Sequence, residues 1–176
     1  MESDHIVLVG LMGSGKSTVG RLLAVLLDRP LIDNDEQIQA ATGRSVAEIS
    51  VREGVPVMRR LEAEVLAQAL ASPVPAVITA AAGTILDEES RRRLRAPYVV
   101  WLRAEPATLA TRVAADPLRP LLGDEPGPVF EMLERQRSAF YAKVTDLTVH
   151  VDGLTPADVA ATIAAQVSTR RTPPHD

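Results

Sequence analysis

The stretch Ile6-Val-Leu-Val-Gly10-Leu-Met-Gly-Ser-Gly15-Lys16-Ser17 decides the fold of this chain. Four apolar residues predict a buried strand, the pattern Gly-x-x-x-x-Gly-Lys-Ser follows at once, and a helical pattern begins at its end. In this order they predict a phosphate-binding loop (P-loop), because backbone N–H groups and the positive end of the helix dipole then face one anion. A glycine-rich turn with a chance lysine is the alternative, and the shared register of strand, motif and helix disfavours it.

The alternation of short apolar runs with longer helical patterns continues along the chain. Such repeated strand–helix units predict an α/β fold with three layers, in which a five-stranded parallel sheet carries helices on both faces as in P-loop kinases. Two helix starts are explicit, a capping box at Ser45-Val-Ala-Glu48 and a cap at Thr155 before Pro156. The predicted strands are 6–9, 30–33, 76–79, 98–102 and 147–151, and the predicted helices are 15–28, 35–42, 45–53, 56–72, 87–95, 106–116, 127–145 and 155–168.

Composition limits the function classes. The 176 residues fit a single domain over 1–176, and a net charge of −4 argues against nucleic acid as a partner. The absence of cysteine excludes disulfides and thiolate catalysis. No run approaches the roughly 20 apolar residues of a membrane span, and the polar start does not fit a signal peptide. We therefore expect a cytoplasmic monomer that binds neither nucleic acid nor membrane.

Two segments are expected to be less ordered. The stretch 116–128 is broken by proline and glycine, yet it carries Arg119 between two helical patterns. This composition predicts a mobile lid over about 113–127. The polar, proline-bearing residues of about 169–176 predict a frayed tail.

The predicted nucleotide site binds ATP and Mg²⁺. Lys16 offers a cation to the β- and γ-phosphates, and the Ser17 hydroxyl is a ligand for Mg²⁺. Asp33 and Asp35 follow the second strand at the edge where ligands collect, so one carboxylate can hold the metal's water shell while the other orients an attacking hydroxyl. The alternative interpretation makes both residues helix caps. The residues predicted to bind ATP are Gly10, Gly13, Ser14, Gly15, Lys16, Ser17 and Thr18.

Six ordered motifs resemble the shikimate kinases, a family of small P-loop enzymes, from about Ile6 to Val167. Besides the P-loop these are Leu31-Ile-Asp-Asn-Asp35, Thr42-Gly-Arg-Ser-Val-Ala-Glu-Ile49, Arg59-Arg-Leu-Glu62, Arg119-Pro-Leu-Leu122 and Arg137-Ser-Ala-Phe-Tyr141. The resemblance implies an ATP-dependent phosphotransferase that converts shikimate to shikimate 3-phosphate in aromatic amino-acid biosynthesis.

The resemblance also implies roles for single residues. Asp35 would orient the attacked hydroxyl, and Arg59 and Arg137 would grip the acceptor carboxylate, with Glu62 holding Arg59. Arg119 on the lid would neutralise charge at the γ-phosphate. Arg112 and Pro156 match positions that sandwich adenine. From spacing alone, however, Arg59 and Arg137 are also compatible with ordinary solvated arginines on helix faces.

The chain departs from the family pattern in the acceptor motif. The family's Gly-Gly-Gly is replaced by Ala81-Ala82-Gly83, which places methyl groups beside the ligand and makes any positive φ costly. Met58 replaces a phenylalanine, Val55 a glutamate and Ala139 a proline. Three hypotheses remain open: a shikimate kinase with a tightened pocket, a kinase of another polyhydroxy acid or cyclitol, and a non-catalytic nucleotide-binding regulator.

Overall fold

The sheet is built from runs that are buried on both faces. In the computed structural model, which describes residues 4–115 and 126–171, the five strands form one parallel sheet in the order β2-β3-β1-β4-β5. All four residues of β1 are buried, as the apolar run predicts. The strands are β1 (Ile6–Val9), β2 (Leu31–Asp33), β3 (Val77–Thr79), β4 (Tyr98–Arg103) and β5 (Leu147–His150).

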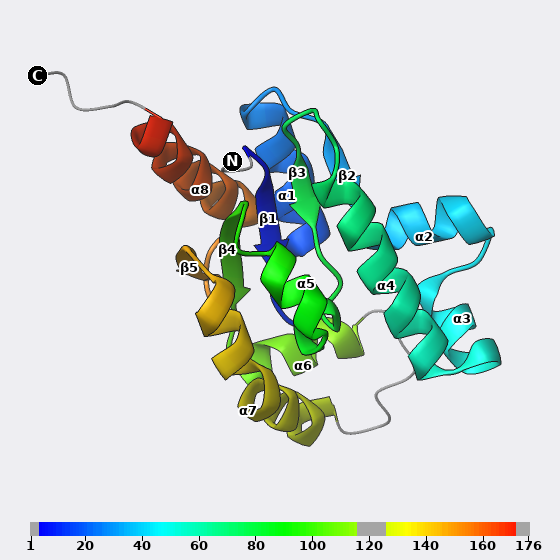
Figure 1. Ribbon diagram of the computed structural model, residues 1–176. Coiled ribbons are helices and arrows are strands. Elements are labelled where there is room, and N and C mark those ends of the chain that lie inside the picture. Colours follow the sequence, from blue (N-terminus) through cyan, green and yellow to red (C-terminus); the bar gives the residue numbers. More distant parts are fainter. Residues whose placement is uncertain (1–3, 116–125, 172–176) are drawn as a thin grey trace, which may run out of the picture.

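Helices cover both faces of the sheet, which confirms the predicted α/β architecture. Figure 1 shows α4 and α5 on one face and α1 and α8 on the other. Helices α2 and α3 lie beyond the edge strand β2, where both contact α4. The helices are α1 (Lys16–Leu26), α2 (Asn34–Thr42), α3 (Val46–Glu53), α4 (Val55–Leu70), α5 (Glu88–Arg93), α6 (Pro106–Ala114), α7 (Pro126–Val144) and α8 (Pro156–Arg171), with a 3₁₀ turn η1 (Thr84–Leu86) that the sequence pattern did not predict.

The strand register brings polar side chains together at the carboxyl edge. Thr79 of β3 pairs with Leu8 of β1 on one side and with Asp33 of β2 on the other. The chain then leaves each of these strands into a loop or helix at the same edge. Since ligands of open parallel sheets bind at this edge, the register fixes where the site is built.

Both predicted caps are confirmed. Ser45 Oγ accepts the Glu48 N–H at 3.2 Å while the Glu48 carboxylate accepts the Ser45 N–H at 2.8 Å, which is a complete capping box. Thr155 and Asp158 make the equivalent pair of contacts before α8. Caps of this kind contribute about 1 kcal/mol each.

The predicted bounds of the lid and the tail need correction. Residues 113–114 belong to α6 and 126–127 to α7, while 116–125 lie outside the described residues. Helix α8 runs to Arg171, so 169–171 are helical rather than frayed. Arg170 holds this last turn, because its guanidinium lies 3.8 Å from the Asp146 carboxylate and 4.9 Å from the Tyr98 ring centre. Within residues 4–115 and 126–171, none of the helices combines the length and the apolar character that a membrane span requires.

Candidate active site

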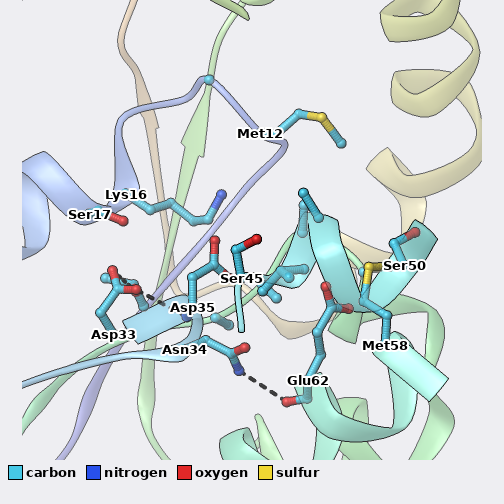
Figure 2. A pocket seen from close by; sticks show the side chains of 18 of the residues that line it. Met12, Lys16, Ser17, Asp33, Asn34, Asp35, Ser45, Ser50, Met58 and Glu62 are labelled. Carbon is cyan, nitrogen blue, oxygen red and sulfur yellow. Dashed lines mark hydrogen bonds between the residues drawn. The ribbon is translucent and has the colours of Figure 1, made fainter. Parts of the chain in front are cut away.

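A cleft of about 520 Å³ opens at the carboxyl edge of the sheet. Its walls come from the P-loop after β1, the start of α2, parts of α3 and α4, and the loop after β3. The P-loop and the predicted acceptor residues therefore line one common cleft. Figure 2 shows the two sides of the cleft, one with Lys16, Ser17 and Asp33 and the other with Ser50, Met58 and Glu62.

The P-loop forms a backbone cradle that needs glycine. Gly10 has φ +146°, and a Cβ there would lie 2.5 Å from the Leu102 carbonyl oxygen. Gly15 precedes α1 in the left-handed region and supplies no side-chain cap, so the first N–H groups of this helix are open to an anion. The Ser14 hydroxyl is buried without a hydrogen-bond partner. A cradle of open backbone donors with an orphaned polar atom fits a polyphosphate.

Lys16 holds its charge over this cradle. Its Nζ donates to the Gly10 carbonyl at 2.9 Å and to the Leu11 carbonyl at 3.1 Å. Both acceptors are neutral, so these bonds position the ammonium group without cancelling its charge. The arrangement agrees with the predicted contact between Lys16 and the transferred phosphate.

The two aspartates after β2 lie differently. Asp33 is 3% exposed, caps α2 by accepting the N–H groups of Asp35 and Glu36, and accepts the Thr79 hydroxyl at 2.8 Å. The cap interpretation of Asp33 is thus confirmed, and its carboxylate is fixed beside the P-loop. Asp35 in the first turn of α2 is exposed and lines the cleft (Figure 2). It is therefore the carboxylate of the two that a ligand reaches more readily.

Arg59 belongs to a half-buried ion pair, so it is not a fully solvated arginine on a helix face. Its guanidinium donates to the Glu62 carboxylate at 2.8 Å, and Glu62 is only 4% exposed. Burial raises the pKa of Glu62, and the neighbouring Arg59 opposes that rise. Gly83 permits this arrangement, because a Cβ there would lie 1.2 Å from Arg59 Nη1. The predicted Arg59–Glu62 pair is thus confirmed. It packs directly against the loop formed by Ala81, Ala82 and Gly83, which we call the acceptor loop.

Arg137 is buried as well, with 5% of its surface exposed, so it is no ordinary surface arginine. Its Nη1 donates to the Ala82 carbonyl at 3.0 Å, while its Nε is buried without a partner. Burial lowers the pKa of this guanidinium. A buried cation with an unused N–H is costly unless an anion binds, so the position fits a carboxylate ligand.

The residues expected at adenine are only partly brought together. Arg112 lines the cleft and donates to the Gly13 carbonyl at 3.3 Å and to the Val151 carbonyl at 3.5 Å. Pro156 starts α8, is exposed and is absent from the cleft walls. Arg119 lies outside the described residues. The sandwich of adenine by Arg112 and Pro156 remains a prediction.

Comparison with known proteins decides the family. The shikimate kinase family model matches residues 12–168. The chain belongs to the shikimate kinase family. It is 44% identical over 170 residues to a shikimate kinase of Symbiobacterium thermophilum, covering 94% of this chain and 97% of that protein. It is 37% identical over 163 residues to one of Rhodococcus jostii, covering 92% and 96%.

A solved structure agrees. Shikimate kinase from Acinetobacter baumannii in complex with shikimate is 30% identical, matches with a TM-score of 0.90 and covers 96% of this chain and 95% of that one. The resemblance seen in the sequence motifs is therefore confirmed over nearly the whole chain.

The alanines that depart from the family's acceptor motif are not strained. Asp28 is the one non-glycine residue with positive φ in the described chain, so Ala81 and Ala82 keep ordinary backbone angles and the expected cost of a positive φ does not arise. Both line the cleft, as does Met58. The other two departures, Val55 and Ala139, are exposed and do not line it. Of the expected departures from the family pattern, only those at Met58, Ala81 and Ala82 therefore line the cleft.

Glycine at these two positions should destabilise the protein without changing its chemistry. We expect the Ala81→Gly, Ala82→Gly double variant to lose about 1–2 kcal/mol of unfolding free energy, because glycine orders at greater entropic cost where φ is negative. Its kcat/KM for shikimate should stay within about tenfold of the parent, or about 1.4 kcal/mol. Denaturant unfolding and steady-state kinetics measure both. A large gain in shikimate turnover from a nearly inactive parent would mean that the methyl groups exclude shikimate.

Three polar residues of the site carry no role in the sequence interpretation. The Thr79 hydroxyl donates to the Asp33 carboxylate. A polar residue at the end of an otherwise apolar strand could have indicated that Thr79 belongs to the site. Asn34 donates to the Glu62 main-chain oxygen at 3.0 Å, while its own Oδ1 is buried without a partner. Tyr141 belongs to a family motif, but its contact with the acceptor loop depends on packing that no local pattern reveals.

Proposed function

We propose that this chain transfers the γ-phosphoryl group of ATP to the 3-hydroxyl of shikimate and so makes shikimate 3-phosphate for aromatic amino-acid biosynthesis. The observation that carries the proposal is the clamp formed by Arg59 and Arg137 against the loop 81–83, in the same cleft as the P-loop. The buried carboxylate of Glu62 pairs with Arg59, and Arg137 adds a second, buried cation with an unpartnered Nε. The two arginines therefore suit an acceptor with a carboxylate of its own.

The nucleotide would lie on the P-loop. The open N-terminus of α1 and the orphaned Ser14 hydroxyl support binding of the phosphates by residues 10–18. The Ser17 hydroxyl and the Asp33 carboxylate would hold Mg²⁺, because oxygen donors are what this ion prefers. When bound, Mg²⁺ neutralises charge on the phosphate oxygens. Arg112 would cover the nucleotide from α6.

The protein contributes mainly position and charge to the reaction. Asp35 would accept a hydrogen bond from the attacked hydroxyl, orient it and take its proton as the bond to phosphorus forms. Lys16 would stabilise charge on the phosphate oxygens during transfer, and Arg119 would do so from the segment outside the described residues. Arg59 and Arg137 would fix the far end of the acceptor, so that the hydroxyl approaches in line.

We further propose a single-domain, cytoplasmic monomer without nucleic-acid or membrane partners. The net charge of −4 supports the absence of a polyanionic partner. Kinases of other polyhydroxy acids share the fold, but the gluconokinase of Sinorhizobium meliloti is only 20% identical. That likeness concerns the fold alone, and we do not favour gluconate or a cyclitol.

An acceptor screen tests the proposal. ADP release with ATP·Mg is measured for shikimate, quinate, gluconate and a set of cyclitols. We expect kcat/KM to be highest for shikimate by at least tenfold. A higher value for an uncharged cyclitol would contradict the carboxylate clamp, and nucleotide binding without turnover of any acceptor would support a regulatory protein instead.

A further inference from the structure

One carbonyl of the acceptor loop is held by two donors from a distant helix. The Ala82 oxygen accepts from Arg137 Nη1 and from the Tyr141 hydroxyl, both at 3.0 Å. The two donors are four residues apart on α7, so they lie side by side on one helix face. Both are buried, Tyr141 at 2% exposure. Helix α7 therefore presents a cation and a neutral donor to the same oxygen.

Packing leaves the Tyr141 hydroxyl little freedom. Its ring stacks on Trp101 of β4, with ring centres 5.4 Å apart and 24° between the planes. Arg103 covers the Trp101 ring at 4.9 Å and pairs with Glu134 of α7 at 2.8 Å. Burial raises the pKa of Tyr141, so its phenol keeps its proton and remains a donor. The stack thus fixes a hydroxyl that points at the acceptor loop.

The other two carbonyls of this loop are satisfied locally. Ala81 oxygen accepts from the Thr84 hydroxyl at 2.7 Å, and Gly83 oxygen accepts from the Leu86 N–H at 3.0 Å. Only for Ala82 does the orientation of the carbonyl depend on α7. A carbonyl oxygen has two lone pairs, and with both engaged the planar Ala82–Gly83 peptide is fixed. Tyr141 therefore helps to orient the backbone on which Arg59 packs.

We propose that Tyr141 is a positioning residue for acceptor binding, acting through Arg137. The tyrosine donates to one of the two lone pairs of the Ala82 oxygen, so Arg137 needs to donate only Nη1 to the other. The remaining N–H groups of Arg137, the unpartnered Nε included, are then left for the acceptor carboxylate. Without the phenol, the guanidinium turns further toward the carbonyl and away from the ligand. This inference rests on the proposed function.

The test compares Tyr141→Phe with Tyr98→Phe, which alters the chain's other tyrosine at the start of β4. Phenylalanine keeps the stack on Trp101 and removes only the hydroxyl. We expect Tyr141→Phe to raise KM for shikimate about five- to tenfold, the range for one net hydrogen bond. KM for ATP and kcat should change less than about twofold, and Tyr98→Phe should change none of the three.

A double-mutant cycle with Arg137→Lys distinguishes positioning from general structure. If Tyr141 acts through Arg137, the effect of Tyr141→Phe on shikimate KM should fall below about twofold in the Arg137→Lys background. An undiminished effect there, or a loss spread equally over both KM values and kcat, would overturn the inference. Normal shikimate turnover with an unchanged KM in Tyr141→Phe contradicts this inference alone. A parent that does not phosphorylate shikimate contradicts the proposed function as well.

Discussion

Replacement of Lys16 by alanine is expected to lower kcat by about 10²–10³-fold while the fold remains intact. The side chain lies over the P-loop and bonds to two backbone carbonyls, so we expect its loss to remove charge at the transferring phosphate and no core packing. Asp33→Asn should also reduce turnover by orders of magnitude, because it removes charge beside Ser17. Steady-state kinetics measure the turnover of both variants, and circular dichroism checks that the fold remains intact.

The chain contains its own control for this variant. Lys143 is the only other lysine and is exposed near the end of α7. Lys143→Ala removes the same charge from the protein and should leave kcat within about twofold. Near-normal turnover in Lys16→Ala would refute the assignment of the P-loop as the catalytic nucleotide site.

The second large effect is expected at Arg59. Arg59→Ala should weaken the binding of shikimate by about 2–4 kcal/mol, which is the scale for losing one member of a desolvated charge pair. It should barely change KM for ATP. The acceptor loses part of its clamp, and Glu62 loses the cation that compensates its burial. Part of the damage therefore falls on stability, which is measured separately by denaturant unfolding.

Two companion variants separate these contributions. Arg60→Ala changes the adjacent, exposed arginine and should affect neither KM nor stability by more than about 0.5 kcal/mol. Adding Glu62→Gln to Arg59→Ala removes the unpaired buried charge, so stability should recover while the loss of shikimate affinity persists. A main effect of Arg59→Ala on ATP would contradict its place at the acceptor.

The elements of the fold could be predicted from the sequence because each has a local cause. The predicted strands agree with β1 to β5 within one residue at each end, since apolar runs buried on both faces leave little ambiguity. The start of α3 follows from Ser45 and the start of α8 from Thr155, because each cap acts within four residues. The excess helical length at the C-terminus was missed because Arg170 is held by Asp146, far away in the sequence.

The interior of the site was less predictable for the same reason. Spacing could place Arg59 and Glu62 on one helix face, but it could not show that Glu62 is buried. Nor could it show that Arg137 and Tyr141 meet the Ala82 carbonyl, since 55 and 59 residues separate those partners. The backbone angles of Ala81 and Ala82 could not be predicted either, because φ at those positions depends on how the loop packs against η1 and α7.

Phosphorus NMR of the reaction products shows directly whether the chain phosphorylates shikimate. The parent protein is incubated with ATP, Mg²⁺ and shikimate, and the phosphorus signals are followed with time. We expect a new phosphate monoester on the 3-oxygen of shikimate, formed in equal amount to ADP. ADP that accumulates without this ester, or no reaction while another acceptor is phosphorylated, would contradict it.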